Sequence, residues 1–99
     1  MISLTLCPHV ERGVFDLDLF DAFLGDKLIC TSRQPLFDGA RALLERGVAP
    51  DTPLAIRHAG KDHDSFAPEP VSELAKWTYV ENPRDGLQKV LWRPPEVAA

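Results

Sequence analysis

The sequence has few cysteines, and it lacks long hydrophobic runs, glycine-rich loops and an excess of basic residues. Its 99 residues include two cysteines and six glycines, and the glycines stand singly instead of forming a phosphate-binding loop. No stretch approaches the roughly eighteen apolar residues that a membrane-spanning helix needs. The first residues also lack the basic start and long apolar core of a signal peptide. The sequence therefore predicts a cytoplasmic protein that does not bind a membrane.

The charge balance is acidic. Fifteen acidic residues against eleven basic ones give a formal net charge of −4 at pH 7, which argues against general nucleic-acid or anionic-membrane binding but not against a local basic patch. Hydrophobic residues at 44% and charged residues at 26% are typical of a folded domain. The length favours a single domain, expected over residues 1–95, with a loose tail over 96–99.

The two cysteines, Cys7 and Cys30, are expected to be reduced. They fall at the ends of the first and third predicted strands, which would lie about 9.6 Å apart if the second strand separates them. That separation exceeds the limit of roughly 7 Å between the Cα atoms of a disulfide. Cys7 and His9 form one close pair of possible metal ligands, but no second pair has the spacing of a zinc site. No cofactor is expected.

Alternating apolar and polar residues predict strands over 1–7 and 14–20, and residues 27–31 complete a meander. A helix is predicted over Pro35–Arg46, because its apolar residues recur at spacings of three, four and seven and Gly47 follows it.

Strands are also predicted over 54–59, 76–81 and 87–93, and residues 71–75 can form one helical turn. The last two strands would form a terminal hairpin. The expected fold is a single α+β domain with a mostly antiparallel sheet, in the order βββαβββ, and one helix packed on one face. Its expected core consists of Phe15, Leu17, Leu19, Phe37, Leu43, Leu44 and Ile56.

A local excess of acidic residues lies between positions 11 and 26. Asp16 and Asp18 project from the same face of one predicted strand, about 6.6 Å apart along it, which is close to the spacing of phosphates in one nucleic-acid strand. This pattern predicts a docking surface for a basic protein partner, although it is also typical of a face that is charged for solubility. The proposed partner-binding residues are Glu11, Asp16, Asp18, Asp21 and Asp26.

The terminal hairpin offers an alternative function as a nucleic-acid-binding module. Basic residues there alternate with Trp77, Tyr79 and Trp92, and such mixtures are typical of surfaces that bind single strands. Trp77 and Tyr79 share one face of the strand, however, as core residues do, so at least one tryptophan is expected in the core. The basic residues concerned are Lys76, Arg84, Lys89 and Arg93.

A third hypothesis concerns a metal-dependent site between residues 58 and 64. This segment holds His58, Asp62, His63 and Asp64, which are possible ligands or general bases. No known motif fixes their spacing, so a solvated loop is the favoured interpretation. The serines also lack a nucleophile-elbow motif. The protein is therefore expected not to be an enzyme.

The segment Ala40–Gly60, ARALLERGVAPDTPLAIRHAG, resembles a pattern in small alphaproteobacterial and prophage-associated proteins with no assigned activity. In that pattern a helix ending in Leu-Leu-x-x-Gly precedes Pro-x-Thr-x-Leu and Arg-His-x-Gly. The resemblance extends over residues 13–80. It implies an accessory protein of a mobile element, which binds and inhibits a host factor such as a CRISPR or other defence nuclease.

Overall fold

The predicted α+β domain is confirmed in the computed structural model, which describes residues 1–65 and 67–94; for residues 15–18 it describes the backbone alone. The predicted tail over 96–99 lies outside the described residues. A strand of two residues, β5, adds to the predicted order. The elements are β1 (Ile2–Glu11), β2 (Val14–Leu24), β3 (Lys27–Ser32), α1 (Pro35–Glu45), β4 (Pro53–His58), β5 (Glu69–Pro70), α2 (Val71–Ala75), β6 (Trp77–Asn82) and β7 (Gly86–Leu91).

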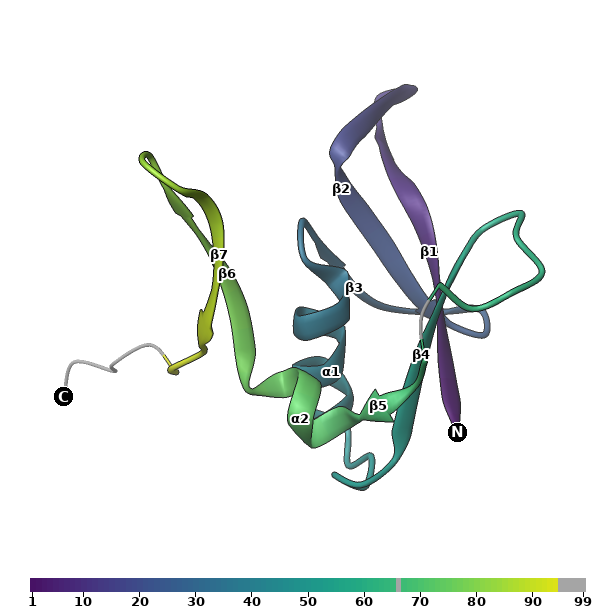
Figure 1. Ribbon diagram of the computed structural model, residues 1–99. Coiled ribbons are helices and arrows are strands. Elements are labelled where there is room, and N and C mark those ends of the chain that lie inside the picture. The colour runs from purple at the N-terminus through teal and green to yellow at the C-terminus, as the bar shows by residue number, and fades with distance from the viewer. Residues whose placement is uncertain (66, 95–99) are drawn as a thin grey trace, which may run out of the picture.

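The strands form two separate sheets. The main sheet has the order β3-β2-β1-β4-β5, and β6 and β7 form a sheet of their own. All neighbours are antiparallel except β1 and β4, which are parallel. Parallel pairing requires a long crossover connection, which α1 supplies on one face of the main sheet. The predicted terminal hairpin is confirmed, and it lies on the other side of α1 from the main sheet (Figure 1).

Helix α1 supplies one half of the core. Pro35 occupies its first turn, where a missing N–H leaves no hydrogen bond unmade. The predicted core residues Phe37, Leu43 and Ile56 are buried, and Leu44 packs against them while half-buried. Helix and sheet approach closely at Gly39, where an added Cβ would lie 2.8 Å from Cδ1 of Leu4.

The first hairpin is longer than the sequence predicted. The predicted strands cover residues 1–7 and 14–20, whereas residues 8–11 continue β1 and β2 extends to Leu24. The turn itself contains only Arg12 and Gly13, both with positive φ, as a two-residue hairpin turn requires. The register changes between Pro8, opposite Phe20, and His9, opposite Asp16. Such an irregularity accommodates a proline, which cannot donate a hydrogen bond to the ladder.

This change of register explains why the predicted core of β2 is wrong at Leu19. Residues 17–19 have no partner in the register with β1, so alternation does not carry Leu19 into the core, and it is only half-buried. The side chains of Phe15 and Leu17 lie outside the described residues. Leu4 and Leu6 of β1 are instead buried core residues of this hairpin.

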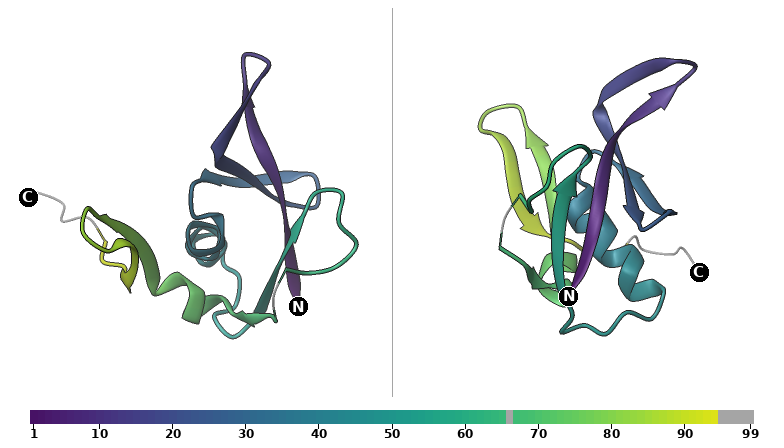
Figure 2. Two further views of the ribbon diagram at one scale, coloured as in Figure 1. Left: turned by 45° about the horizontal axis from the view of Figure 1, so that its top comes forward. Right: turned by 90° about the vertical axis from the view of Figure 1, so that its right-hand side faces the viewer.

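Figure 2 shows the main sheet, α1 and the hairpin as successive layers, with α2 at the base of the hairpin. Val71, Leu74 and Ala75 of α2 join the buried cluster beneath α1. In the described parts of the chain, no helix has both the length and the apolar character needed to cross a membrane.

Candidate functional site

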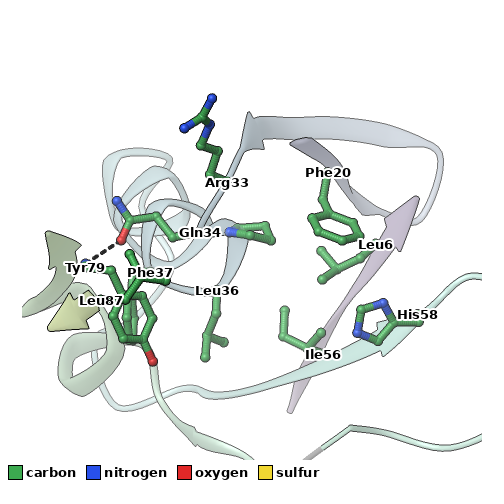
Figure 3. A pocket seen from close by; sticks show the side chains of 11 residues that line it. Leu6, Phe20, Arg33, Gln34, Leu36, Phe37, Ile56, His58, Tyr79 and Leu87 are labelled. Atoms are coloured by element: carbon green, nitrogen blue, oxygen red, sulfur yellow. Dashed lines mark hydrogen bonds between the residues drawn. The ribbon is translucent and has the colours of Figure 1, made fainter. Parts of the chain in front are cut away.

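A cleft of about 350 Å³ lies between the main sheet and the hairpin, at the N-terminal turn of α1. Figure 3 shows Leu36 between Tyr79 on one side and Ile56 on the other. The volume is at the lower end of the range of about 300–1,000 Å³ typical of ligand pockets. The lining residues come from three places: Leu6, Phe20, Ile56 and His58 from the main sheet, residues 33–37 from the start of α1, and Tyr79 and Leu87 from the hairpin.

The chemistry of the cleft is mainly apolar. Arg33 is the one lining residue with a permanent charge, and no carboxylate lines the cleft within the described ranges. His58 meets the ring of Phe20 edge to face, with 6.0 Å between the ring centroids. The cleft therefore suits an apolar group better than a charged one.

Gln34 and Phe37 of the α1 region hold β6 against one side of the cleft. The side-chain oxygen Oε1 of Gln34 accepts hydrogen bonds from the backbone N–H of Tyr79 at 2.7 Å and the hydroxyl of Thr78 at 3.0 Å. The ring of Phe37 lies 5.2 Å from that of Tyr79, centroid to centroid. These contacts fix the position of Tyr79, since they bind both its backbone and its ring.

Arg41 attaches the base of the hairpin to α1. Its guanidinium donates hydrogen bonds to the backbone carbonyls of Ala75 at 3.2 Å and Trp77 at 2.7 Å. The same side chain pairs with Asp38 and lies 4.6 Å from the centroid of the Trp92 ring. The interaction between a guanidinium and an aromatic face is attractive. The Arg41 side chain therefore joins α1 to the start of β6 and to the residue after β7, which lie together at the base of the hairpin.

The predicted acidic residues do not gather at one place among those whose side chains are described. Glu11 lies at the end of β1 and Asp26 in the turn after β2, which are opposite ends of β2. Asp21 accepts a hydrogen bond from Thr31 at 2.6 Å, and the same oxygen lies 2.9 Å from Nδ1 of His9. The side chains of Asp16 and Asp18 are outside the described residues. The acidic docking surface stays a prediction.

The predicted basic residues of the hairpin also lie at different places and contact different groups. Lys76 pairs with Glu73 at 2.9 Å, while Lys89 Nζ lies 4.6 Å from the centroid of the Trp77 ring. Arg84 lies in the turn between β6 and β7, and Arg93 follows β7.

The tryptophans of the hairpin already have partners inside the molecule. Trp77 packs against the core, which confirms the prediction that at least one tryptophan does so. The ring of Trp92 lies against Arg41. Tyr79 and Trp92 keep exposed fractions of 45% and 38%, and a stacking surface for bases needs exposed rings, so nucleic-acid binding stays a prediction.

The residues between His58 and Asp64 are not brought together. His58 lines the cleft, Asp64 lies 3.3 Å from Arg57, and His63 contacts its exposed neighbour Asp62 at 3.2 Å. Within residues 1–65 and 67–94, no group of three or more histidines, cysteines or carboxylates is placed to hold a metal ion. The metal hypothesis therefore gains no support from the geometry.

The cysteines are both free, and Cys30 is poorly suited to nucleophilic chemistry. Burial, with the nearby carboxylate of Asp38 as a second cause, raises the pKa of its thiol from 9.0 to about 11. The thiolate is the reactive form of cysteine, so the raised pKa makes Cys30 a poor nucleophile near neutral pH.

Sequence reasoning missed the cleft because its walls come from distant parts of the chain. Gln34 contacts Tyr79 across 45 residues, and no local pattern predicts such a contact. One signal was present: Leu87 and Leu91 fall on one face of a predicted strand, while the sequence predicts a single long helix, which covers the main sheet.

Comparison with known proteins finds no matching family model, no similar curated protein and no similar solved structure. The resemblance to alphaproteobacterial and prophage-associated proteins thus stays a prediction, as does inhibition of a host nuclease. Function has to be argued from the cleft and the surfaces beside it.

Proposed function

We propose that the protein is a non-catalytic binding module that holds a protein partner against its hairpin and the adjoining cleft. One observation carries this proposal: the exposed apolar side chains concentrate on the hairpin. Among the described side chains, nine large hydrophobic residues are exposed, and five of them lie between residues 79 and 92. Three of the five, Tyr79, Leu87 and Leu91, share one face of the hairpin, and exposed apolar surface gathered in this way is typical of interaction sites.

The extent of this surface favours a protein over a small molecule. Leu87 is 69% exposed and reaches the cleft, but Leu91, which is 58% exposed on the same face of β7, lies outside its lining. A small ligand in the cleft would leave Leu91 in water. A protein partner would cover Leu87 and Leu91 together with Tyr79, which shares their face of the hairpin and belongs to a residue type enriched at the centres of interfaces.

Capture from a bacterial lysate, with and without nuclease, tests the proposal through variants. Replacing Leu87 and Leu91 with serine should abolish capture of a nuclease-resistant partner, because both apolar contacts are lost. Two matched double variants serve as controls: Asp16→Lys with Asp18→Lys, and Arg84→Glu with Arg93→Glu. Both should retain the partner.

Two other outcomes would give the function to a different surface. Loss of capture in the aspartate variant alone would assign binding to the acidic strand. Loss in the arginine variant, together with nucleic acid in the bound fraction, would make the hairpin a nucleic-acid-binding surface.

A further inference from the structure

The hairpin has one backbone edge that remains open. Antiparallel strands alternate between pairs that exchange two backbone hydrogen bonds and pairs whose backbone groups point outward. The N–H of Trp92 donates to the carbonyl of Lys76 at 2.7 Å, which marks one bonded pair just beyond the ladder of β6 and β7. Counting from Trp92 by twos, Val90, Gln88 and Gly86 belong to bonded pairs. The outward-pointing groups on β7 therefore belong to Leu87, Lys89 and Leu91.

Contacts along β6 agree with this alternation. The outward N–H of Tyr79 donates to Gln34, and the outward carbonyl of Trp77 accepts from Arg41. Side chains of the α1 region thus cover the outer edge of β6. The outer edge of β7 has no backbone partner among the residues that the structure describes.

The side chains along this open edge have a distinct order. Leu87, Lys89 and Leu91 alternate in sequence and so share one face of β7, with an exposed leucine on each side of the lysine. No described carboxylate lies within 4.0 Å of the Lys89 ammonium group, which is near the rings of Trp77 and Phe37. The edge therefore presents an apolar, positive, apolar pattern.

We infer that β7 accepts an extended segment of a partner protein as an additional strand. The segment carries an acidic side chain opposite Lys89 and apolar side chains opposite Leu87 and Leu91. Strand addition supplies partners for the free backbone groups, and opposite charges directly across a ladder stabilise the pairing. This inference rests on the proposed function and specifies how the hairpin binds its partner.

A second copy of the chain suits this edge less well. In the symmetric antiparallel pairing that sets Leu87 against Leu91 of the other copy, the two Lys89 side chains stand directly opposite each other. Like charges in that position destabilise a pair of strands. A partner with a carboxylate at the central position has no such repulsion.

A synthetic peptide tests the charge pattern directly. The peptide has nine residues with capped ends, isoleucine at its third and seventh positions, glutamate at its fifth, and serine or threonine elsewhere. Its affinity for the full chain is measured by calorimetric titration. We expect binding that Lys89→Glu weakens by about tenfold or more, because attraction becomes repulsion. A peptide with lysine at the fifth position should prefer the Lys89→Glu protein.

The control variant is Arg84→Glu, which makes the same change in net charge at the hairpin turn and should leave affinity for the peptide within about twofold. Lys89→Met keeps an apolar contact with Trp77 and should give an intermediate affinity. Circular dichroism and backbone NMR of each variant establish that the hairpin remains folded.

Two methylated peptides test strand pairing itself. One carries N-methyl groups at its third, fifth and seventh residues, and the other at its fourth and sixth residues. Only one of these sets of N–H groups faces β7, so one peptide should lose binding and the other retain it.

The results separate this inference from the proposed function. If the parent peptide does not bind, or both methylated peptides bind equally well, strand addition at β7 is wrong. If the serine variant of Leu87 and Leu91 still loses its lysate partner, the hairpin remains the binding surface. A dimer of the chain that Leu87→Ser with Leu91→Ser dissociates would also overturn the inference, because the edge would then belong to a second copy.

Discussion

The main sheet and the hairpin each have a strand with two leucines on one face, but the leucines of β1 are buried and those of β7 are exposed. In β1, Leu4 and Leu6 alternate with polar residues and lie buried beneath α1. In β7, Leu87 and Leu91 share one face with Lys89 between them, and both leucines are exposed. No described residue from Trp77 to Leu91 is buried. An apolar stripe thus becomes core or contact surface according to what the topology places over it.

The two regions also differ in how they are stabilised. The main sheet has α1 against one face, and burial of apolar surface supplies its stability. A two-stranded hairpin has no such interior and is marginal by itself. Its described contacts with α1 include the hydrogen bonds of Gln34 and Arg41 and the ring contact of Phe37 with Tyr79. We therefore expect substitutions to act globally in the first region and locally in the second.

The largest expected effect is the loss of an apolar side chain between α1 and the main sheet. Leu43 is fully buried, so Leu43→Ala should lower the free energy of unfolding by about 2–5 kcal/mol in urea denaturation. Leu44→Ala, one residue further along α1, should cost less because Leu44 is only half-buried. Equal losses for the two variants would mean that the buried face of α1 is misassigned.

A smaller effect is expected at the junction of the two regions. Arg41→Met removes the donor for two backbone carbonyls, and leaving such acceptors unpaired costs about 1–3 kcal/mol. Hydrogen exchange should accelerate in β6 and β7 while β1 and β4 keep their protection. Arg46→Met, at the exposed end of α1, is the control and should change neither region. Uniform acceleration across both sheets would mean that the hairpin does not open independently of the main sheet.

The close contact of α1 with β1 should give a still smaller change. An alanine at position 39 favours the helix by about 1 kcal/mol over glycine, but its Cβ would lie 2.8 Å from Cδ1 of the buried Leu4. Relieving such overpacking costs about 1–3 kcal/mol. Gly39→Ala should therefore lose about 1 kcal/mol in thermal or urea unfolding, whereas Glu45→Ala on the exposed surface of α1 should be nearly neutral. A stabilised Gly39→Ala variant would mean that Leu4 moves aside freely.

The sequence predicted local elements better than their arrangement. The helix from Pro35 and the terminal hairpin were found because each has a regular period and a clear end signal, such as Gly47 after the helix. The continuation of β1 past Pro8 was missed, since proline and charged residues are typical of turns. The irregular register opposite Phe20 accommodates this proline within the strand.

The candidate site was less predictable than the fold. Its cleft depends on the hairpin staying apart from the main sheet, and that separation depends on contacts such as Gln34 with Tyr79. The charge pattern predicted a docking surface at Asp16 and Asp18, whereas the leucines of β7 were predicted only to lie in a strand. A pattern of period two identifies a face without saying whether another element covers it.

The smallest expected effect on stability belongs to the residues with the largest proposed role in binding. Leu87→Ser with Leu91→Ser replaces side chains that are 69% and 58% exposed, and exposed substitutions usually change stability by no more than about 0.5 kcal/mol. Urea unfolding should therefore be nearly unchanged while binding of the nine-residue peptide is lost. A loss of stability comparable to that of Leu43→Ala would mean that the two leucines are structural. In that case β7 would not differ from β1, because Leu87 and Leu91 would stabilise the fold as Leu4 and Leu6 do and would not form a contact surface.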